Sequence, residues 1–274
     1  MLLPLAALLA AAVLQPVPLR VEASEESDEQ ALVDLCKLPA ATLLLRTRSN
    51  MLATGVVEAL RRCPRAIVEV RLPLLPAHRE RFEKLPRVAL LLTLHPGESI
   101  DALALSALGP RRLHLRVLGP LTPERAAELA RLRDVEIELD LRERTPDAEE
   151  LARFRGLGRA DRWLRLPSTA SPELIPVLAA VKPTGLVVES ARNGVEPALL
   201  EALRRQGLPT RVVLVWPFIA ADLEALVPLR QLSLQFDLQT IERLPHALTP
   251  ALSPVEPSRA PPGHAGPEPA TPLR

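Results

Sequence analysis

The chain has 274 residues, of which 47% are hydrophobic, so it is long and apolar enough to build a sizeable folded core. Its 34 lysine and arginine residues nearly balance its 33 acidic residues, and the formal net charge of +1 gives no overall field toward nucleic acid or an anionic membrane. Aromatic residues make up only 2% and tyrosine is absent, which removes the usual stacking surfaces for bases and sugars. A disordered protein and a nucleic-acid-binding protein are therefore both disfavoured.

The first residues have the character of an export signal. Residues 2–14 form an apolar run of the length of a signal-peptide core, which is too short to span a membrane comfortably. Val21-Glu22-Ala23 before Ser24 fits cleavage after a small residue. We therefore predict a signal peptide at 1–23 and a periplasmic or secreted mature protein without integral membrane attachment. A buried N-terminal helix is the alternative.

Cys36 and Cys63 are the only cysteines of the chain. Two cysteines in an exported protein suggest one disulfide, here between a capping helix near 28–37 and the next helix near 51–62. Two free buried thiols are the alternative. Neither cysteine has a nearby histidine and their spacing matches no metal motif, so no metal or cofactor is expected.

Residues 111–141 contain one complete strand–turn–helix unit and the start of the next. Leu113, Leu115 and Val117 alternate with polar residues, as in a strand with one buried face. Thr122-Pro123-Glu124 then places a hydroxyl cap, a proline and an acid at the start of a helix. Thr145-Pro146-Asp147 and Ser171-Pro172-Glu173 repeat this helix opening.

The strand pattern recurs roughly every 20-odd residues, which is typical of a stacked repeat architecture. It predicts nine strands and a single α/β repeat domain over 24–245. Residues 246–274 are rich in proline and lack apolar periodicity, so they are predicted to be a disordered tail. The predicted strands are 43–47, 66–72, 88–94, 112–117, 135–141, 162–166, 185–190, 211–216 and 231–236.

Two architectures fit alternating short strands and helices: an open solenoid, or a closed eight-stranded barrel. The units are short for a (βα)8 barrel of about 250 residues, and a ninth strand has no place in an eight-stranded ring. The polar strand faces would also point into a packed barrel interior, where each unpaired charge costs several kcal/mol. We therefore predict the open, horseshoe-like solenoid, with a small (βα)8-like barrel as the alternative.

Three strands carry a recognisable family motif. Leu113-His114-Leu115, Ile137-Glu138-Leu139 and Leu232-Ser233-Leu234 match the Leu-x-Leu strand core of leucine-rich repeats, and residues 40–240 resemble the ribonuclease-inhibitor-like branch of that family. The Asn or Cys that the family places after the strand is missing. The resemblance implies a non-enzymatic interaction module that binds a protein or peptide partner on its concave sheet face.

On such a face the charged strand residues would form the binding strip. Alternatively, they pair with one another across the strands on a solvated surface and bind nothing. The candidate residues are Glu69, Arg71, His114, Arg116, Glu136, Glu138 and Asp140.

The barrel alternative implies an enzyme, with hydrolase-type chemistry at the C-terminal ends of the strands. No Walker loop, nucleophile elbow or His-Glu-x-x-His motif appears, so no catalytic residue is assigned. His95 in His-Pro-Gly is typical of a turn, and Trp163 and Trp216 are expected in the core. Residues at the strand ends would be Arg48, Arg71, His95, Arg116, Asp140, Glu189 and Trp216.

Overall fold

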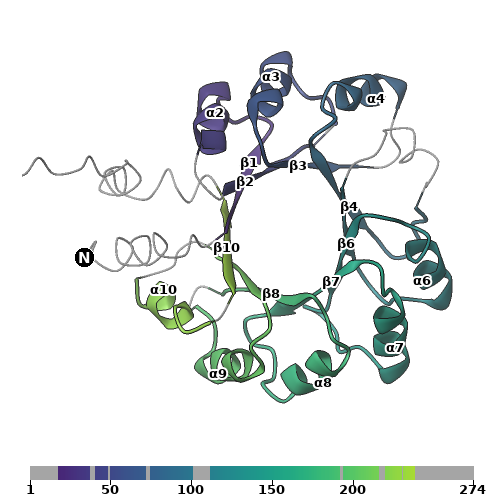
Figure 1. Ribbon diagram of the computed structural model, residues 1–274, viewed down its shortest axis with the longest axis vertical. Coiled ribbons are helices and arrows are strands. Elements are labelled where there is room, and N and C mark those ends of the chain that lie inside the picture. Colours follow the sequence, from purple (N-terminus) through teal and green to yellow (C-terminus); the bar gives the residue numbers. More distant parts are fainter. Residues whose placement is uncertain are drawn as a thin grey trace, which may run out of the picture.

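The computed structural model describes residues 18–37, 41–48, 50–71, 75–100, 112–191, 194–215, 220–229 and 231–237. Ten parallel strands in this part of the chain form one closed barrel (Figure 1). They are β1 (Leu19–Ser24), β2 (Ala41–Arg46), β3 (Ala66–Val70), β4 (Ala89–Leu94), β5 (Leu113–Val117), β6 (Val135–Asp140), β7 (Asp161–Pro167), β8 (Gly185–Glu189), β9 (Thr210–Val213) and β10 (Leu232–Asp237).

Each strand pairs with its neighbours in sequence, and β10 pairs with β1 to close the ring. At this seam Leu19 lies opposite Leu234 and Val21 opposite Phe236, while the other edge of β1 pairs with β2 over its whole length. Because all strands are parallel, every strand begins at one end of the barrel and finishes at the other. We call these the amino end and the carboxyl end.

Helices surround the barrel as an outer layer (Figure 1). No helix in the described ranges is long and apolar enough to cross a membrane. The described helices are α2 (Glu29–Lys37), α3 (Thr54–Arg62), α4 (Pro76–Glu83), α6 (Pro123–Leu129), α7 (Ala148–Gly156), α8 (Leu174–Ala180), α9 (Pro197–Gln206) and α10 (Ala220–Leu226).

The main hydrophobic core lies between strands and helices. Leu115 and Val117 of β5 and Ile137 and Leu139 of β6 belong to it and are almost completely buried. Thr122 caps α6 by accepting a hydrogen bond from the Arg125 amide, as its sequence pattern predicts. The outward-facing half of every alternating strand is therefore used for packing under the helices.

The prediction of an open solenoid was wrong, and with it the resemblance to leucine-rich repeats. Closure itself agrees with the alternative architecture, although the barrel has ten strands rather than eight. The nine predicted strands correspond to β2–β10, and the missing one is β1, at residues that had been interpreted as the end of a signal peptide. With β1 in place, the last strand has a partner and no edge is left open.

The predicted disulfide between Cys36 and Cys63 is confirmed, with a Cα–Cα distance of 5.0 Å. It joins α2 to the residue that ends α3. The helix near 28–37 is thus a regular member of the outer layer rather than a cap on an open row. The predicted tail at 246–274 lies outside the described residues, and cleavage at residue 23 remains a prediction that would remove most of β1.

Candidate functional site

The inner face of the barrel carries the polar half of each alternating strand. In β6, for example, Val135, Ile137 and Leu139 pack under the helices, so Glu136 and Glu138 face inward. A ten-stranded barrel is wider than an eight-stranded one, whose interior is just filled by side chains. Long arginine and glutamate side chains can span this width. The charged strand residues, which were the reason to predict an open solenoid, therefore do lie inside a barrel, but most of them form ion pairs with one another.

Glu136 is the centre of the pairing near the amino end. Its Oε1 lies 3.2 Å from Nη1 of Arg211 and 3.8 Å from Nη2 of Arg20. His114 Nδ1 lies 3.2 Å from the same oxygen, although its direction is not that of a hydrogen bond. Arg211 also stacks on Trp163, with its guanidinium carbon 4.4 Å from the ring centre.

Glu138 organises the middle of the barrel in the same way. It accepts a hydrogen bond of 2.8 Å from Nε of Arg116 and one of 3.1 Å from Nη1 of Arg165. Arg211 lies 3.8 Å away and so bridges the two glutamates. Glu138 and Arg165 are both buried, so each charge depends on the others for compensation.

Toward the carboxyl end, Arg165 also donates to Glu189 at 2.6 Å. Arg142, just after β6, holds both Asp140 at 2.8 Å and Glu189 at 2.7 Å. Ion pairs therefore run continuously from the middle of the barrel to its carboxyl end on the side of β6, β7 and β8.

The seam between β1 and β10 is closed by a further polar group. Glu22 of β1 forms an ion pair of 2.6 Å with Arg46 of β2 and accepts a hydrogen bond from the side chain of Gln235 on β10. Glu22 and Gln235 are buried, whereas the Arg46 side chain is 54% exposed. Arg46 thus keeps guanidinium donors that are open to solvent.

These contacts shift the ionisation of the enclosed groups. Burial opposes the charged form of Glu138, but the positive charges of Arg116, Arg165 and Arg211 outweigh it and lower its pKa to about 2. Burial also opposes ionisation of Glu136, yet His114 and Arg211 hold its pKa below the usual range. In the same way, Arg165 and Arg142 outweigh burial at Glu189 and lower its pKa. Glu136, Glu138 and Glu189 are therefore ionised at neutral pH.

Arg20 is affected in the opposite sense. Burial and the nearby charge of Arg211 lower its pKa to about 10, despite the attraction of Glu136. It remains a cation at neutral pH, so the ion-pair network keeps its full charge.

The other side of the interior is apolar. Leu44, Ile67 and Leu91, from β2, β3 and β4, form a small buried cluster separate from the outer core. Two residues further along each of these strands comes an inward-facing polar side chain, because alternation returns to the same face. These residues are Arg46, Glu69 and Thr93, which we call the β2–β4 triad.

Glu69 differs from the other inward-facing carboxylates in this part of the chain. It is half-buried at the carboxyl end of β3, and within the described residues its carboxylate has no ion pair or hydrogen bond. Glu22, Glu136, Glu138, Asp140 and Glu189 each have at least one partner. Among the inward-facing carboxylates that the structure describes, Glu69 is thus the one whose oxygens have no protein partner.

The backbone around Glu69 is firmly held. Thr47 donates a hydrogen bond of 3.0 Å to the Glu69 carbonyl oxygen. Asn50 donates to the Arg71 carbonyl at 2.7 Å and accepts from the Arg71 amide at 2.9 Å. Asn50 adopts a left-handed conformation with φ 59°, which asparagine tolerates better than most residues. The end of β3 is therefore positioned by side chains from the preceding connection.

The connections that follow β4, β5 and β6 are braced by buried charged residues. Arg125 donates to the carbonyl oxygens of His95, Glu98 and Leu118. Glu150 accepts from the Leu121 amide at 2.6 Å and pairs with Arg144. These contacts tie neighbouring connections together and give the carboxyl end a fixed shape.

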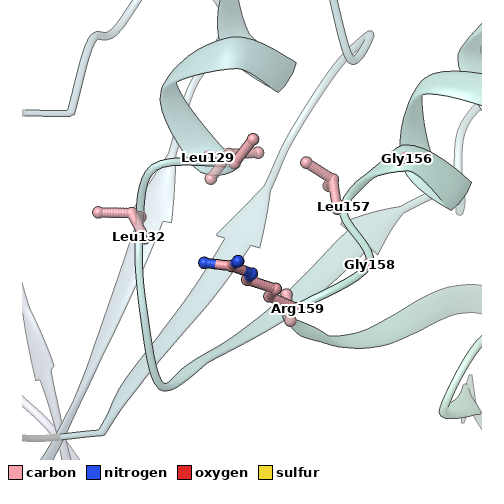
Figure 2. Close-up of a pocket in the computed structure, with 8 residues that line it drawn as sticks. Leu129, Leu132, Gly156, Leu157, Gly158 and Arg159 are labelled. Carbon is pink, nitrogen blue, oxygen red and sulfur yellow. The ribbon is translucent and has the colours of Figure 1, made fainter.

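Three grooves formed by described residues flank the barrel, and one of them, of about 430 Å³, lies between α8 and α9. The other two lie at the two ends of the barrel. One of about 540 Å³ lies between the connections that follow β6 and β7, with Leu141, Leu166 and Leu174 among its lining residues and Arg142 at its edge. The other, of about 250 Å³, lies at the amino end between the connections that follow α6 and α7 (Figure 2). In the described ranges, no three His, Cys, Asp or Glu side chains are grouped closely enough to hold a metal ion.

The structure gathers most of the predicted binding residues inside the barrel. His114, Arg116, Glu136, Glu138 and Asp140 belong to the ion-pair network, and Glu69 to the triad. Arg71 lies just beyond β3 with an exposed side chain. The prediction of a partner-binding concave face was wrong, because the polar sheet face is enclosed by a closed barrel and no macromolecule can reach it.

The structure places the strand-end residues that were named for the barrel alternative in different environments. Asp140, Arg116 and Glu189 face the interior, whereas Arg48 and His95 are exposed on connections. Trp216 lies outside the described residues, and Trp163 packs against Arg211. Sequence reasoning missed Arg20, Glu22, Thr93, Arg165 and Arg211 as interior residues. The alternation of Leu19, Val21 and Ala23 with Arg20 and Glu22 could have revealed the first two.

Comparison with known proteins adds little. No known protein family matches the chain, and no curated protein matches it significantly. Among solved structures, it is similar to tryptophan synthase from M. tuberculosis, in an open form with BRD0059 bound. The sequence identity is 15%, the match covers 91% of this chain and 94% of the other, and the TM-score is 0.42. Because so weak a likeness carries no information on activity, the function has to be inferred from the barrel's own side chains.

Proposed function

We propose that this protein is an enzyme that hydrolyses a small polar substrate at the carboxyl end of its barrel, with Glu69 as the general base. The observation that supports this most strongly is the unpartnered, half-buried carboxylate of Glu69 in an interior where the other described carboxylates are held by partners. Active sites of βα barrels lie at this end, where the connections from strand to helix meet.

Ion pairing argues against the neighbouring glutamates as bases. A general base works best when its pKa lies near the working pH. Arginine contacts hold the pKa values of Glu138 and Glu189 below their usual range, so these groups have little tendency to take up a proton. Their role is to anchor Arg116, Arg165 and Arg142, while the Glu69 carboxylate has no ion pair or hydrogen bond within the described residues and can contact water.

Arg46 and Thr93 complete the proposed site. Arg46 has an ion pair to Glu22 and is half-exposed, so its remaining donors can stabilise negative charge on a substrate oxygen. Thr93 is half-buried on the next strand after Glu69 and offers a hydroxyl donor. In the proposed reaction, Glu69 removes a proton from water as the water oxygen bonds to the substrate's electrophilic atom, and Arg46 stabilises the developing oxyanion. The oxyanion then collapses, the bond to the leaving group breaks, and the leaving group takes the proton from Glu69, which restores the carboxylate. The apolar cluster of Leu44, Ile67 and Leu91 forms the floor beneath.

We also propose that the enzyme works outside the cytoplasm, in the periplasm or in secreted form. The disulfide between Cys36 and Cys63 supports this, because structural disulfides persist in oxidising compartments. The apolar run at residues 2–14 supports it independently.

The test is a set of chromogenic nitrophenyl esters, phosphates and glycosides, assayed with the wild-type protein and with Glu69→Gln. Loss of a general base is expected to reduce kcat by about a hundredfold or more. Glu143→Gln is the matched control, because Glu143 is exposed at the same end of the barrel and has no described partner. Failure of the wild-type protein to turn over any of the three substrate classes, or equal rates in the Glu69→Gln variant, would reject the proposal.

A further inference from the structure

We propose that the amino end of the barrel is a docking surface for an anionic lipid bilayer. The connections from helix to strand all lie at this end because all strands are parallel. Exposed basic side chains occur in most of them. They include Arg65, Arg87, Arg131, Arg133, Arg159 and Lys182, and none of these has an ion pair within the described residues.

At the carboxyl end, exposed acidic residues outnumber the exposed basic residues Arg46, Arg48, Arg71 and Arg142 in the described part of the chain. The connections from strand to helix, with the first helical turns, carry exposed carboxylates that include Glu26, Asp28, Glu124, Glu143, Asp147 and Glu196. The net charge of +1 therefore conceals a strong separation of charge along the barrel axis. Although such a molecule has almost no net charge, its charge separation orients it near a charged surface, with the basic end toward an anionic one.

Compensation of the helix dipole explains only part of this pattern. The dipole favours cations within the last helical turn, as with Arg61 and Arg62 of α3. Arg65 instead directly precedes β3, and Arg133 and Arg159 lie just before β6 and β7, beyond the helix ends. Asp134 and Asp161 are the acids nearest in sequence to Arg133 and Arg159, and Asp161 is already paired with Arg112. A surplus of unpaired positive charge therefore remains at this end.

A cavity on the same end provides a place for part of a lipid. The groove of about 250 Å³ between the connections that follow α6 and α7 is lined by Leu129, Leu132 and Leu157. Figure 2 shows Arg159 reaching across this space from one connection toward the other, on which Leu132 lies. A cation beside leucine side chains suits a phosphate headgroup attached to apolar chains.

The shape and composition of this end favour a bilayer over nucleic acid. Its charges are spread over connections around the ring rather than gathered in one groove, so they can face a flat surface together. Tyrosine is absent and aromatic residues are few, so bases would find little to stack on. Docking in this orientation would turn the carboxyl end, with the β2–β4 triad, toward the aqueous phase.

The experiment is co-sedimentation of the full chain with vesicles of phosphatidylcholine alone and of phosphatidylcholine mixed with phosphatidylglycerol. We expect binding only to the anionic vesicles, and weaker binding as salt is added. Arg133→Glu/Arg159→Glu should weaken it by at least about twentyfold, since each basic residue near an anionic surface contributes about fivefold. Arg48→Glu/Arg71→Glu makes the same charge change at the opposite end and should retain the wild-type affinity.

Thermal melts of each variant establish that it is folded, and Arg65→Glu/Arg131→Glu replaces the first double variant if that one is not. Equal binding to neutral vesicles, no binding to anionic vesicles, or equal loss in the control variant would overturn the proposal. Tighter binding to duplex DNA than to anionic vesicles at the same salt would also overturn it and assign the surface to nucleic acid.

Discussion

Replacement of Glu138 by glutamine tests whether the interior ion pairs stabilise the barrel. The change keeps the size of the side chain and removes one negative charge. It leaves Arg116, Arg165 and Arg211 around a neutral amide in a buried position. Breaking a buried ion pair from one side typically costs about 3–5 kcal/mol, because the remaining charge is uncompensated.

The pKa of Glu138 gives an independent magnitude. Folding lowers it from 4.5 to about 2, and one pKa unit corresponds to about 1.4 kcal/mol, so ionisation of this group favours the folded state by about 3 kcal/mol. Because the folded pKa is the lower one, this contribution is complete above pH 4.5 and is lost as the pH falls through about 2. The destabilisation by Glu138→Gln should therefore be about 3 kcal/mol at pH 7 and should shrink toward pH 2.

The assay is urea unfolding, because urea is uncharged and does not screen ion pairs as guanidinium chloride does. Glu58→Gln is the matched control, since Glu58 pairs with Arg61 on the exposed face of α3 and should contribute at most about 1 kcal/mol. If both variants lose the same small free energy of unfolding, or if the loss in Glu138→Gln is independent of pH, the interior pairs do not stabilise the fold.

Three other changes probe the frame around the site. Cys36→Ser/Cys63→Ser opens a loop closed over a sequence separation of 27 and should lower the free energy of unfolding by about 3–4 kcal/mol, measured against the wild-type protein with and without reductant. Asn50→Gly keeps the left-handed conformation and loses the side-chain hydrogen bonds to Arg71 and Thr47. Asn50→Ala loses the same bonds and also strains the backbone, so it should destabilise more; equal urea midpoints would contradict this. A chain that starts at Ser24 lacks most of β1 and should fail to unfold cooperatively, whereas one that starts at Val17 should melt like the full chain; N-terminal sequencing of secreted protein should then place any cleavage upstream of Leu19.

The outward half of the fold was predictable because it follows from local patterns. Alternation in strands such as Leu113–Val117 and helix openings such as Thr122-Pro123-Glu124 depend on neighbouring residues only. Closure was not predictable in the same way, because it depends on pairing between β1 and β10, which are distant in sequence. A signal peptide at 1–23 would take up most of β1, so the sequence prediction leaves the ring one strand short and favours an open row.

The same long-range geometry explains why the candidate site was only partly predictable. Glu69, Arg116, Glu136 and Glu138 stand out in the sequence as polar residues in apolar strands. Which of them are neutralised depends on partners far along the chain, such as Arg211 for Glu136, and no sequence spacing contains that information. The argument that buried charges forbid a barrel failed because it treated each charge as unpaired.

The width of the barrel connects its stability to its chemistry. Ten strands enclose more space than branched aliphatic residues readily fill, and long ionic side chains fill it only if they are paired. Pairing lowers the pKa values of Glu136, Glu138 and Glu189, so these groups have little tendency to take up a proton at neutral pH. On the proposed mechanism, chemistry occurs where pairing stops, which in the described interior is beside the apolar cluster of β2, β3 and β4, at Glu69. The proposal thus places the reactive position at the boundary between the ionic and apolar parts of the described interior.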